Sequence, residues 1–328
     1  MNKVLLFMCL LGNCIQPTYA QSDEVMAKSY FLKAQQAYSE GNTATAMTNL
    51  DKTVEYLKGT NAKIESLYVK IWVANNNYLN AKKHLNNYFD NAEENHSDYM
   101  EMLAFVADVN SEIEAEKTFL KNLDIEKLNF TENLARVKYK DKYGFIDKAG
   151  STIIPFKFDK AWSFSEGLAL VMLDHKFGFI DKMGQTVIPF EYDVAWSFSE
   201  GLAQVLIDYK SGFINKNGKL VIPIKYNDAD SFSEGLAPVK LGNLSDGTYG
   251  FIDKTGKTVI PFKYKSARSF TDGLALVQLE GKWGYLNNTG QIIIPIKFDY
   301  AWSFSEGKAK VELNDRVFYI DKTGNEIK

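Results

Sequence analysis

Cysteine and histidine are scarce in this chain of 328 residues. The two cysteines, Cys9 and Cys14, both lie near the start, so a chain without that segment would have no disulfide, no thiol chemistry and no cysteine-ligated zinc. The three histidines, His84, His96 and His175, show no metal-ligand spacing. Signatures of serine hydrolases, zinc proteases and phosphate-binding loops are also missing. We therefore predict no catalytic residues, no metal site and no cofactor.

Long hydrophobic runs are missing too. The longest near the start, residues 4–11, is far shorter than the roughly 20 residues that span a bilayer. It follows the basic residue Lys3 and precedes a polar segment with Thr18 and Ala20 at the small-residue positions, so residues 1–20 have the pattern of a secretory signal peptide. A lipoprotein anchor at Cys14 is disfavoured because Asn13 stands where a small residue is expected. We expect export to the periplasm, medium or cell surface, with no transmembrane segment after the signal is removed.

Neither sign of charge dominates. The chain carries 38 basic and 41 acidic side chains, with a net charge of −3. A protein that tracks phosphates needs a basic surface, so we expect no nucleic-acid partner. Hydrophobic residues make up 45% of the chain and charged residues 24%, which indicates a globular protein of about two domains.

Residues 21–123 have a helical pattern. Proline is absent from this region after Ser22, glycine occurs only as Gly41 and Gly59, and apolar residues recur at helical spacing. The sequence therefore predicts a helical domain here.

Two short polar segments, "EGN" at 40–42 and "NNN" at 75–77, would break these helices into two hairpins, with a further helix near 97–120. Small residues such as Ala46 and Ala81, thirty-five positions apart, would let antiparallel helices approach closely. The region resembles a short tetratricopeptide array. A plain helical bundle is the alternative.

Residues 124–328 repeat themselves. Six copies begin at Phe130, Phe164, Phe198, Phe232, Phe270 and Phe304. Their spacing is 34 residues, except for one spacing of 38. Each copy has two or more glycines, and the first five also carry an internal Ile-Pro that would break a helix, so the copies must be β-rich. Small units of this kind cannot bury a core alone, and neighbours must stack.

Each copy predicts three strands. After "FSEG", constant residues such as Ala169 and Val171 alternate with variable ones, which indicates a half-buried strand. The second strand holds an aromatic-Gly-aromatic core with the glycines Gly144, Gly178, Gly212, Gly250 and Gly284. The third strand contains prolines that fit only an edge or a strand end, namely Pro155, Pro189, Pro223, Pro261 and Pro295.

The aromatic-Gly-aromatic-Ile-Asp core, the "DKxG" turn and the "FSEGLA" restart resemble WG-containing repeats. Only "KWGY" at 282–285 keeps the Trp-Gly pair itself. The resemblance implies a β-structured array used for protein interaction, and it implies no catalytic mechanism. We expect an α+β multidomain protein, with tetratricopeptide-like hairpins followed by an all-β array. An open curved solenoid is favoured over a propeller, because one spacing is longer and the last copy is short.

One column of the repeats varies strongly. The position after the first Ala of "AWSF" reads Trp162, Trp196, Asp230, Arg268 and Trp302. A core position would not accept Asp and Arg, so we expect the column to face solvent. It could bind a protein partner, or sugar rings could stack on the indoles. The alternative is that each Trp only packs against the adjacent copy.

An acid also recurs in every "FSEG" loop, in the series Glu132, Glu166, Glu200, Glu234, Asp272 and Glu306. One acid per copy cannot supply the converging oxygens of a calcium site. We predict that these acids, like the Asp that opens each "DKxG" turn, make hydrogen bonds within their own turns. The first and sixth copies depart from the pattern and read as caps, with the helical region covering the first.

Overall fold

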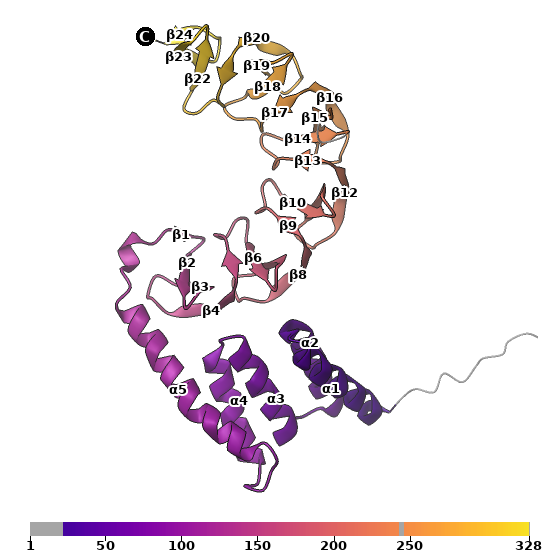
Figure 1. Cartoon of the computed structure of the whole chain (residues 1–328), viewed down its shortest axis with the longest axis vertical. Coiled ribbons are helices and arrows are strands. Elements are labelled where there is room, and N and C mark those ends of the chain that lie inside the picture. Colours follow the sequence, from indigo (N-terminus) through magenta and orange to yellow (C-terminus); the bar gives the residue numbers. More distant parts are fainter. Residues whose placement is uncertain (1–21, 243–245, 328) are drawn as a thin grey trace, which may run out of the picture. The chain divides into compact units, whose positions relative to one another are not determined.

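The computed structural model describes residues 22–242 and 246–327. The predicted signal peptide, residues 1–20, lies outside the described residues. The chain forms two compact units, with the boundary between Glu114 and Ala115. Figure 1 shows the order of their elements, helices first and strands after.

Five α-helices form the first part of the described chain, within residues 22–121. They are α1 (Asp23–Ser39), α2 (Thr43–Leu57), α3 (Ala62–Ala74), α4 (Tyr78–Asn91) and α5 (Tyr99–Lys121). The expected breaks at 40–42 and 75–77 separate α1 from α2 and α3 from α4. Asn42 and Asn77 explain these breaks, because each caps the next helix by accepting a hydrogen bond from a backbone amide three residues on. Small residues such as Ala34, Ala46 and Ala81 are fully buried, which lets the helices pack closely.

The described residues after α5, up to 242 and from 246 to 327, form six four-stranded antiparallel sheets. The first sheet contains β1 (Phe130–Thr131), β2 (Leu134–Tyr139), β3 (Lys142–Ile146) and β4 (Thr152–Phe158). The second contains β5 (Lys160–Ala161), β6 (Ala169–Leu173), β7 (Lys176–Ile180) and β8 (Thr186–Tyr192). The third contains β9 (Val194–Ala195), β10 (Leu202–Ile207), β11 (Lys210–Asn215) and β12 (Leu220–Tyr226). The fourth sheet contains β13 (Asp228–Ala229), β14 (Leu236–Leu241), β15 (Thr248–Asp253) and β16 (Thr258–Tyr264). The fifth contains β17 (Ser266–Ala267), β18 (Ala275–Leu279), β19 (Lys282–Leu286) and β20 (Ile292–Phe298). The sixth contains β21 (Tyr300–Ala301), β22 (Lys308–Leu313), β23 (Arg316–Asp321) and β24 (Glu326–Ile327).

The prediction of three strands per copy was incomplete. The three expected strands are present, but a two-residue strand precedes the "FSEG" loop and pairs with the strand after it, as β9 does with β10. The third sheet therefore begins at Val194 rather than at Phe198. Two residues are too few to show an alternating pattern, so the sequence gives little sign of this strand.

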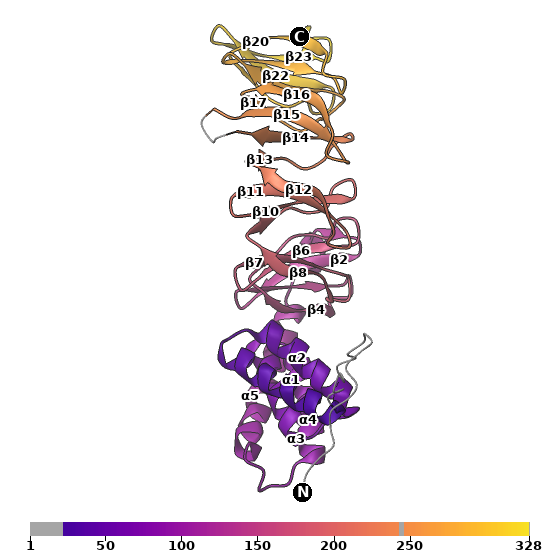
Figure 2. The ribbon, with the colours of Figure 1, turned by 90° about the vertical axis from the view of Figure 1, so that its right-hand side faces the viewer.

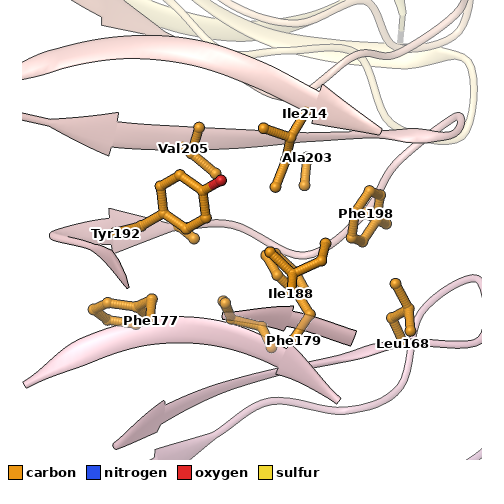
Figure 3. Packing of buried hydrophobic residues seen from close by; sticks show 11 residues of the cluster. Leu168, Phe177, Phe179, Ile188, Tyr192, Phe198, Ala203, Val205 and Ile214 are labelled. Atoms are coloured by element: carbon orange, nitrogen blue, oxygen red, sulfur yellow. The ribbon is translucent and has the colours of Figure 1, made fainter. Parts of the chain in front are cut away.

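The hydrophobic cores lie between successive sheets. Figure 3 shows the core between the second and third sheets, to which the second contributes Leu168, Phe177, Phe179, Ile188 and Tyr192 and the third contributes Phe198, Ala203, Val205 and Ile214. Equivalent residues form the core at the other four junctions. Figure 2 shows the third to sixth sheets following one another in chain order, while the first two overlap in this view.

This stacking corrects the expectation of a half-buried strand. In the interior sheets the variable residues of the first long strand, such as Leu170, Gln204 and Leu276, are as buried as the constant ones. Exposed residues alternate with buried ones only in the end sheets, at Arg136 and Lys310. Each interior sheet is covered on both faces, which one sheet in isolation cannot achieve.

The repeated glycines make room for the outer strand. In the third sheet β12 bulges over Gly212, and a Cβ added there would lie 2.7 Å from the Ile222 carbonyl oxygen. Pro223 lies in the middle of β12, and its missing amide is tolerated because β12 is the edge strand. In the last sheet Phe318 replaces this glycine, and β24 pairs only with the two residues after it, so the described chain places no strand across it.

The predicted cover of the first sheet comes from the end of α5 and the segment after it. Phe119, Leu120 and Leu123 pack with Ala135 and the rest of that sheet's free face. The segment also imitates a preceding sheet. The side chain of Ile125 lies against Gly150 just as Ile154 of the first sheet lies against Gly184 of the second.

We predict that Gly212→Ala lowers the free energy of unfolding of the β-sheet array by about 1–3 kcal/mol, because the new methyl group would press on backbone that has no room to move. Thermal unfolding followed by tryptophan fluorescence measures the change. Gly59→Ala is the control, since a Cβ there meets no atom within 4 Å, and it should leave the midpoint unchanged. An unchanged midpoint for Gly212→Ala would show that β12 does not constrain this glycine.

Candidate interaction surface

The "FSEG" loops form a continuous line of contacts between sheets, which we call the seam. At the junction of the second and third sheets, the Ser165 hydroxyl donates to the Phe198 carbonyl oxygen at 2.8 Å. The Glu166 carboxylate accepts a hydrogen bond from the Gly201 amide at 3.0 Å and pairs with the Lys216 ammonium at 3.1 Å. The same three contacts join the third sheet to the fourth.

The seam corrects the prediction that the "FSEG" acids bond within their own turns. Each of the first five acids instead accepts from the glycine amide of the next sheet, 35 or 39 residues along the chain. The acids of the "DKxG" turns do behave as expected. Asp147, for example, accepts from the amides of Ala149 and Ser151. Both rows of acids therefore serve the structure.

The seam acids adopt a backbone conformation that is unusual for glutamate. Glu166 has a φ of 54°, in the left-handed region, as do its counterparts in the other sheets. This conformation costs about 1 kcal/mol for a residue with a side chain. The charge-assisted bonds to the next sheet are worth on the order of 1–3 kcal/mol and offset that cost.

The seam weakens toward the last sheet. Asn288 of the fifth sheet occupies the position of Lys216, so Glu234 keeps only its bond to the Gly273 amide. At the last junction, Thr271 replaces the serine, and its buried hydroxyl makes no hydrogen bond. The contacts that join the sheets are thus most complete between the second and fourth sheets.

The variable column faces solvent to different degrees. Trp196 and Trp302 expose 39% and 47% of their surface, and Arg268 is also exposed. Trp162 and Asp230 are half-buried. None of the five is sealed in the core, so the column is a surface feature.

The indole rings also contact their own sheets. The ring of Trp162 lies 5.6 Å from that of Phe177 and packs against the core between sheets two and three. The Lys310 ammonium lies 5.0 Å from the ring centre of Trp302. The packing role therefore fits Trp162 best, while Trp196 and Trp302 are more exposed.

The column changes character in the fourth and fifth sheets, where Asp230 and Arg268 replace indoles. Burial raises the pKa of the Asp230 carboxyl; the Arg268 guanidinium opposes that rise, and the neighbouring Asp228 adds to it. Tyr249 donates a hydrogen bond from its hydroxyl to Asp228, and the Lys240 ammonium lies 5.7 Å from the Tyr249 ring centre. Charged and aromatic groups of two sheets thus gather at one place.

Sequence reasoning missed Tyr249 and the buried Lys240 as neighbours of the column. Tyr249 belongs to the aromatic-Gly pair, which reads as structural, and Lys240 lies on the strand expected to be half-buried. The only available signal was the exchange of residue type at both positions between copies, where Tyr249 corresponds to Ser211 and Lys240 to Leu206.

Two of the three histidines make structural contacts, and the third, His175, is exposed. His84 Nδ1 lies 2.6 Å from the buried carboxylate of Glu65, and His96 Nδ1 lies 2.8 Å from the Tyr88 hydroxyl. Within residues 22–242 and 246–327, no three His, Cys, Asp or Glu side chains are grouped as metal ligands would be. No helix in the described ranges is long and apolar enough to cross a membrane.

Comparison with known proteins identifies the repeat. The model of the WG containing repeat matches residues 143–176, 177–210, 212–244, 249–283 and 283–316, which is more than half of the chain. No curated protein sequence matches the chain.

Solved structures give weaker similarities. Kluyveromyces lactis Hsv2 is 10% identical, with a TM-score of 0.39 over 58% of this chain and 71% of that chain. A quinonprotein alcohol dehydrogenase-like protein from Bacteroides thetaiotaomicron is 9% identical, with a TM-score of 0.34 over 61% of this chain and 64% of that one.

We predict that Glu132→Gln destabilises the array near neutral pH but not in acid. The Lys182 ammonium and the Gly167 amide hold the pKa of the Glu132 carboxyl below its ordinary 4.5, so its contribution to stability is present above that pH and is lost as the pH falls through the folded-state pKa. Urea unfolding at about pH 7 and about pH 3 should show a gap between variant and wild type that closes in acid. Glu280→Gln, at a hairpin tip, is the control. A gap of equal size at both pH values would contradict the assignment.

Proposed function

The chain belongs to the WG containing repeat family, and from this premise we propose that it is an exported, non-enzymatic interaction module that presents an extended β-repeat surface to a protein partner. Export rests on the signal-peptide pattern of residues 1–20. The proposal of a non-enzymatic role rests on the missing catalytic signatures and on the structural contacts of His84 and His96.

The observation that carries this proposal is the contrast between constant and variable positions. The seam and core residues recur because every sheet must fit its neighbours. The column of Trp162, Trp196, Asp230, Arg268 and Trp302 is not fully buried in any sheet, and its residue type changes from Trp to Asp and Arg along the array. Exposed Trp and Arg side chains are the types that dominate the energetics of protein interfaces. A constant scaffold that carries a varied, aromatic-rich column is suited to recognising a partner along its length.

An open array supports this role. Sheets contact the next sheet in the chain through the same core at all five junctions. The first sheet is covered by residues 115–128, and the last sheet places Lys308 where the others place a core Leu. Both changes suit ends that face something other than each other, so we propose a solenoid rather than a closed propeller.

Carbohydrate binding is the second candidate. The exposed indoles of Trp196 and Trp302 favour it, since sugar rings stack on aromatic faces. Against it, a face of Trp302 is already occupied by the Lys310 ammonium, and Trp162 packs against Phe177. Two of the three indoles are therefore already in contact with other side chains, which favours a protein partner over stacked sugar rings.

We predict that Trp196→Ala loses most of the binding of the full chain to its partner in a pull-down from envelope extract, because truncating a central aromatic anchor costs about 2 kcal/mol or more. Tyr209→Ala is the matched control, since Tyr209 is 88% exposed at a hairpin tip outside the column, and it should retain binding.

A glycan array probed with the same three proteins separates the candidates. Glycan binding that Trp196→Ala removes would favour carbohydrate recognition. Equal capture by wild type and Trp196→Ala in both assays would contradict the proposed surface.

A further inference from the structure

The charged part of the column differs from the rest in having unused bonding capacity. Asp230 and Arg268, which we call the charged centre, lie in adjacent sheets and interact electrostatically. Neither side chain makes a hydrogen bond or a close ion pair with any other described residue. Asp228, by contrast, accepts bonds from the Tyr249 hydroxyl and the Ala229 amide. The oxygens of Asp230 and the donors of Arg268 are therefore available to a ligand.

Partial burial destabilises the charged form of the Asp230 carboxyl when no partner is bound. The carboxyl is half-buried, and the loss of hydration raises its pKa. A carboxylate that has lost part of its hydration and has no hydrogen-bonded cation is destabilised in its charged form. A partner's ammonium or guanidinium that bonded to it would offset this loss. Arg268 is more exposed and offers a planar fork of donors suited to a carboxylate. Asp230 therefore favours a basic group of the partner, and Arg268 favours an acidic one.

The surroundings add apolar anchors on both sides. Trp196 lies in the sheet before Asp230, and Trp302 lies in the sheet after Arg268. Both indoles are exposed by more than a third. The column from the third to the sixth sheet thus reads aromatic, acidic, basic, aromatic.

We propose that the charged centre selects a peptide segment of the partner that carries a basic side chain opposite Asp230 and an acidic side chain opposite Arg268. The proposal rests on the protein-binding function proposed above and specifies its partner. Stacked sheets lie roughly 10 Å apart and an extended peptide advances about 3.3 Å per residue, so the two charges belong about three residues apart. Apolar or aromatic residues about three positions further out on each side would meet Trp196 and Trp302.

A peptide selection tests this proposal directly and needs no purified partner. A phage-displayed library of random peptides about twelve residues long is selected against the immobilised full chain, which covers the roughly ten residues required. A second selection uses the swap variant Asp230→Arg with Arg268→Asp, which keeps the net charge. We expect wild type to enrich peptides with the basic-to-acidic spacing described, and the swap variant to enrich the reverse order.

Synthetic peptides from the wild-type selection should bind the swap variant at least about 10-fold more weakly, a loss of about 1.4 kcal/mol. If the swap variant does not fold, Arg268→Gln replaces it, because Arg268 is exposed, and it should weaken the same peptides by a similar factor. Equal binding to both proteins, a consensus without paired charges, or no enriched peptide would overturn the proposal.

The proposal and the broader function fail in different ways. Peptides whose binding depends on Trp196 but is unchanged by the swap would contradict the role of the charged centre. They would still agree with the proposed interaction module. Peptides that ignore both the swap and Trp196→Ala would contradict both.

Discussion

No sheet in the array has a hydrophobic core of its own. Every core cluster joins residues of two successive sheets, and the first sheet completes its free face with residues 115–128. A single four-stranded sheet of about 33 residues buries too little apolar surface to offset the entropy of ordering it. Folding therefore depends on the match between neighbouring faces. That dependence explains why "AWSFSEGLA" occurs twice and nearly a third time, since each copy meets the same neighbour.

The seam gives this stacking a direction. Each of the first five acids reaches forward to a glycine amide and, at the first three junctions, to a lysine of the next sheet. A forward contact needs a different solution at each end of the array. Ile125 supplies at the start the side chain that a preceding sheet would have supplied. At the other end, Lys308 replaces a leucine that is needed only where another sheet covers the face. Phe318 replaces a glycine that is needed only where an outer strand crosses it. The loss of seam contacts toward the last sheets leaves stability unequal along the array.

The sequence predicts most of the local structure because local patterns determine it. The three long strands, the helix breaks and the "DKxG" turns follow from alternation, asparagine caps and Asp-Gly spacing within a few residues. The acids of the seam were assigned wrongly because their partner lies 35 residues away, where a single sequence shows no pairing. The burial of Gln204 was missed for the same reason, since the next sheet covers it. The exposed column was recognised because Asp and Arg are incompatible with a core.

The constant residues hold the sheets together, and the variable column is the proposed recognition surface. That surface depends on sheets that stabilise one another. Unfolding of the isolated third sheet, residues 194–226, compared with the array of residues 115–328, tests this dependence most directly. Circular dichroism should show the array unfolding cooperatively while the isolated sheet has no β-structure and no transition. A cooperative transition in the isolated sheet would show that its core is its own and would contradict the account.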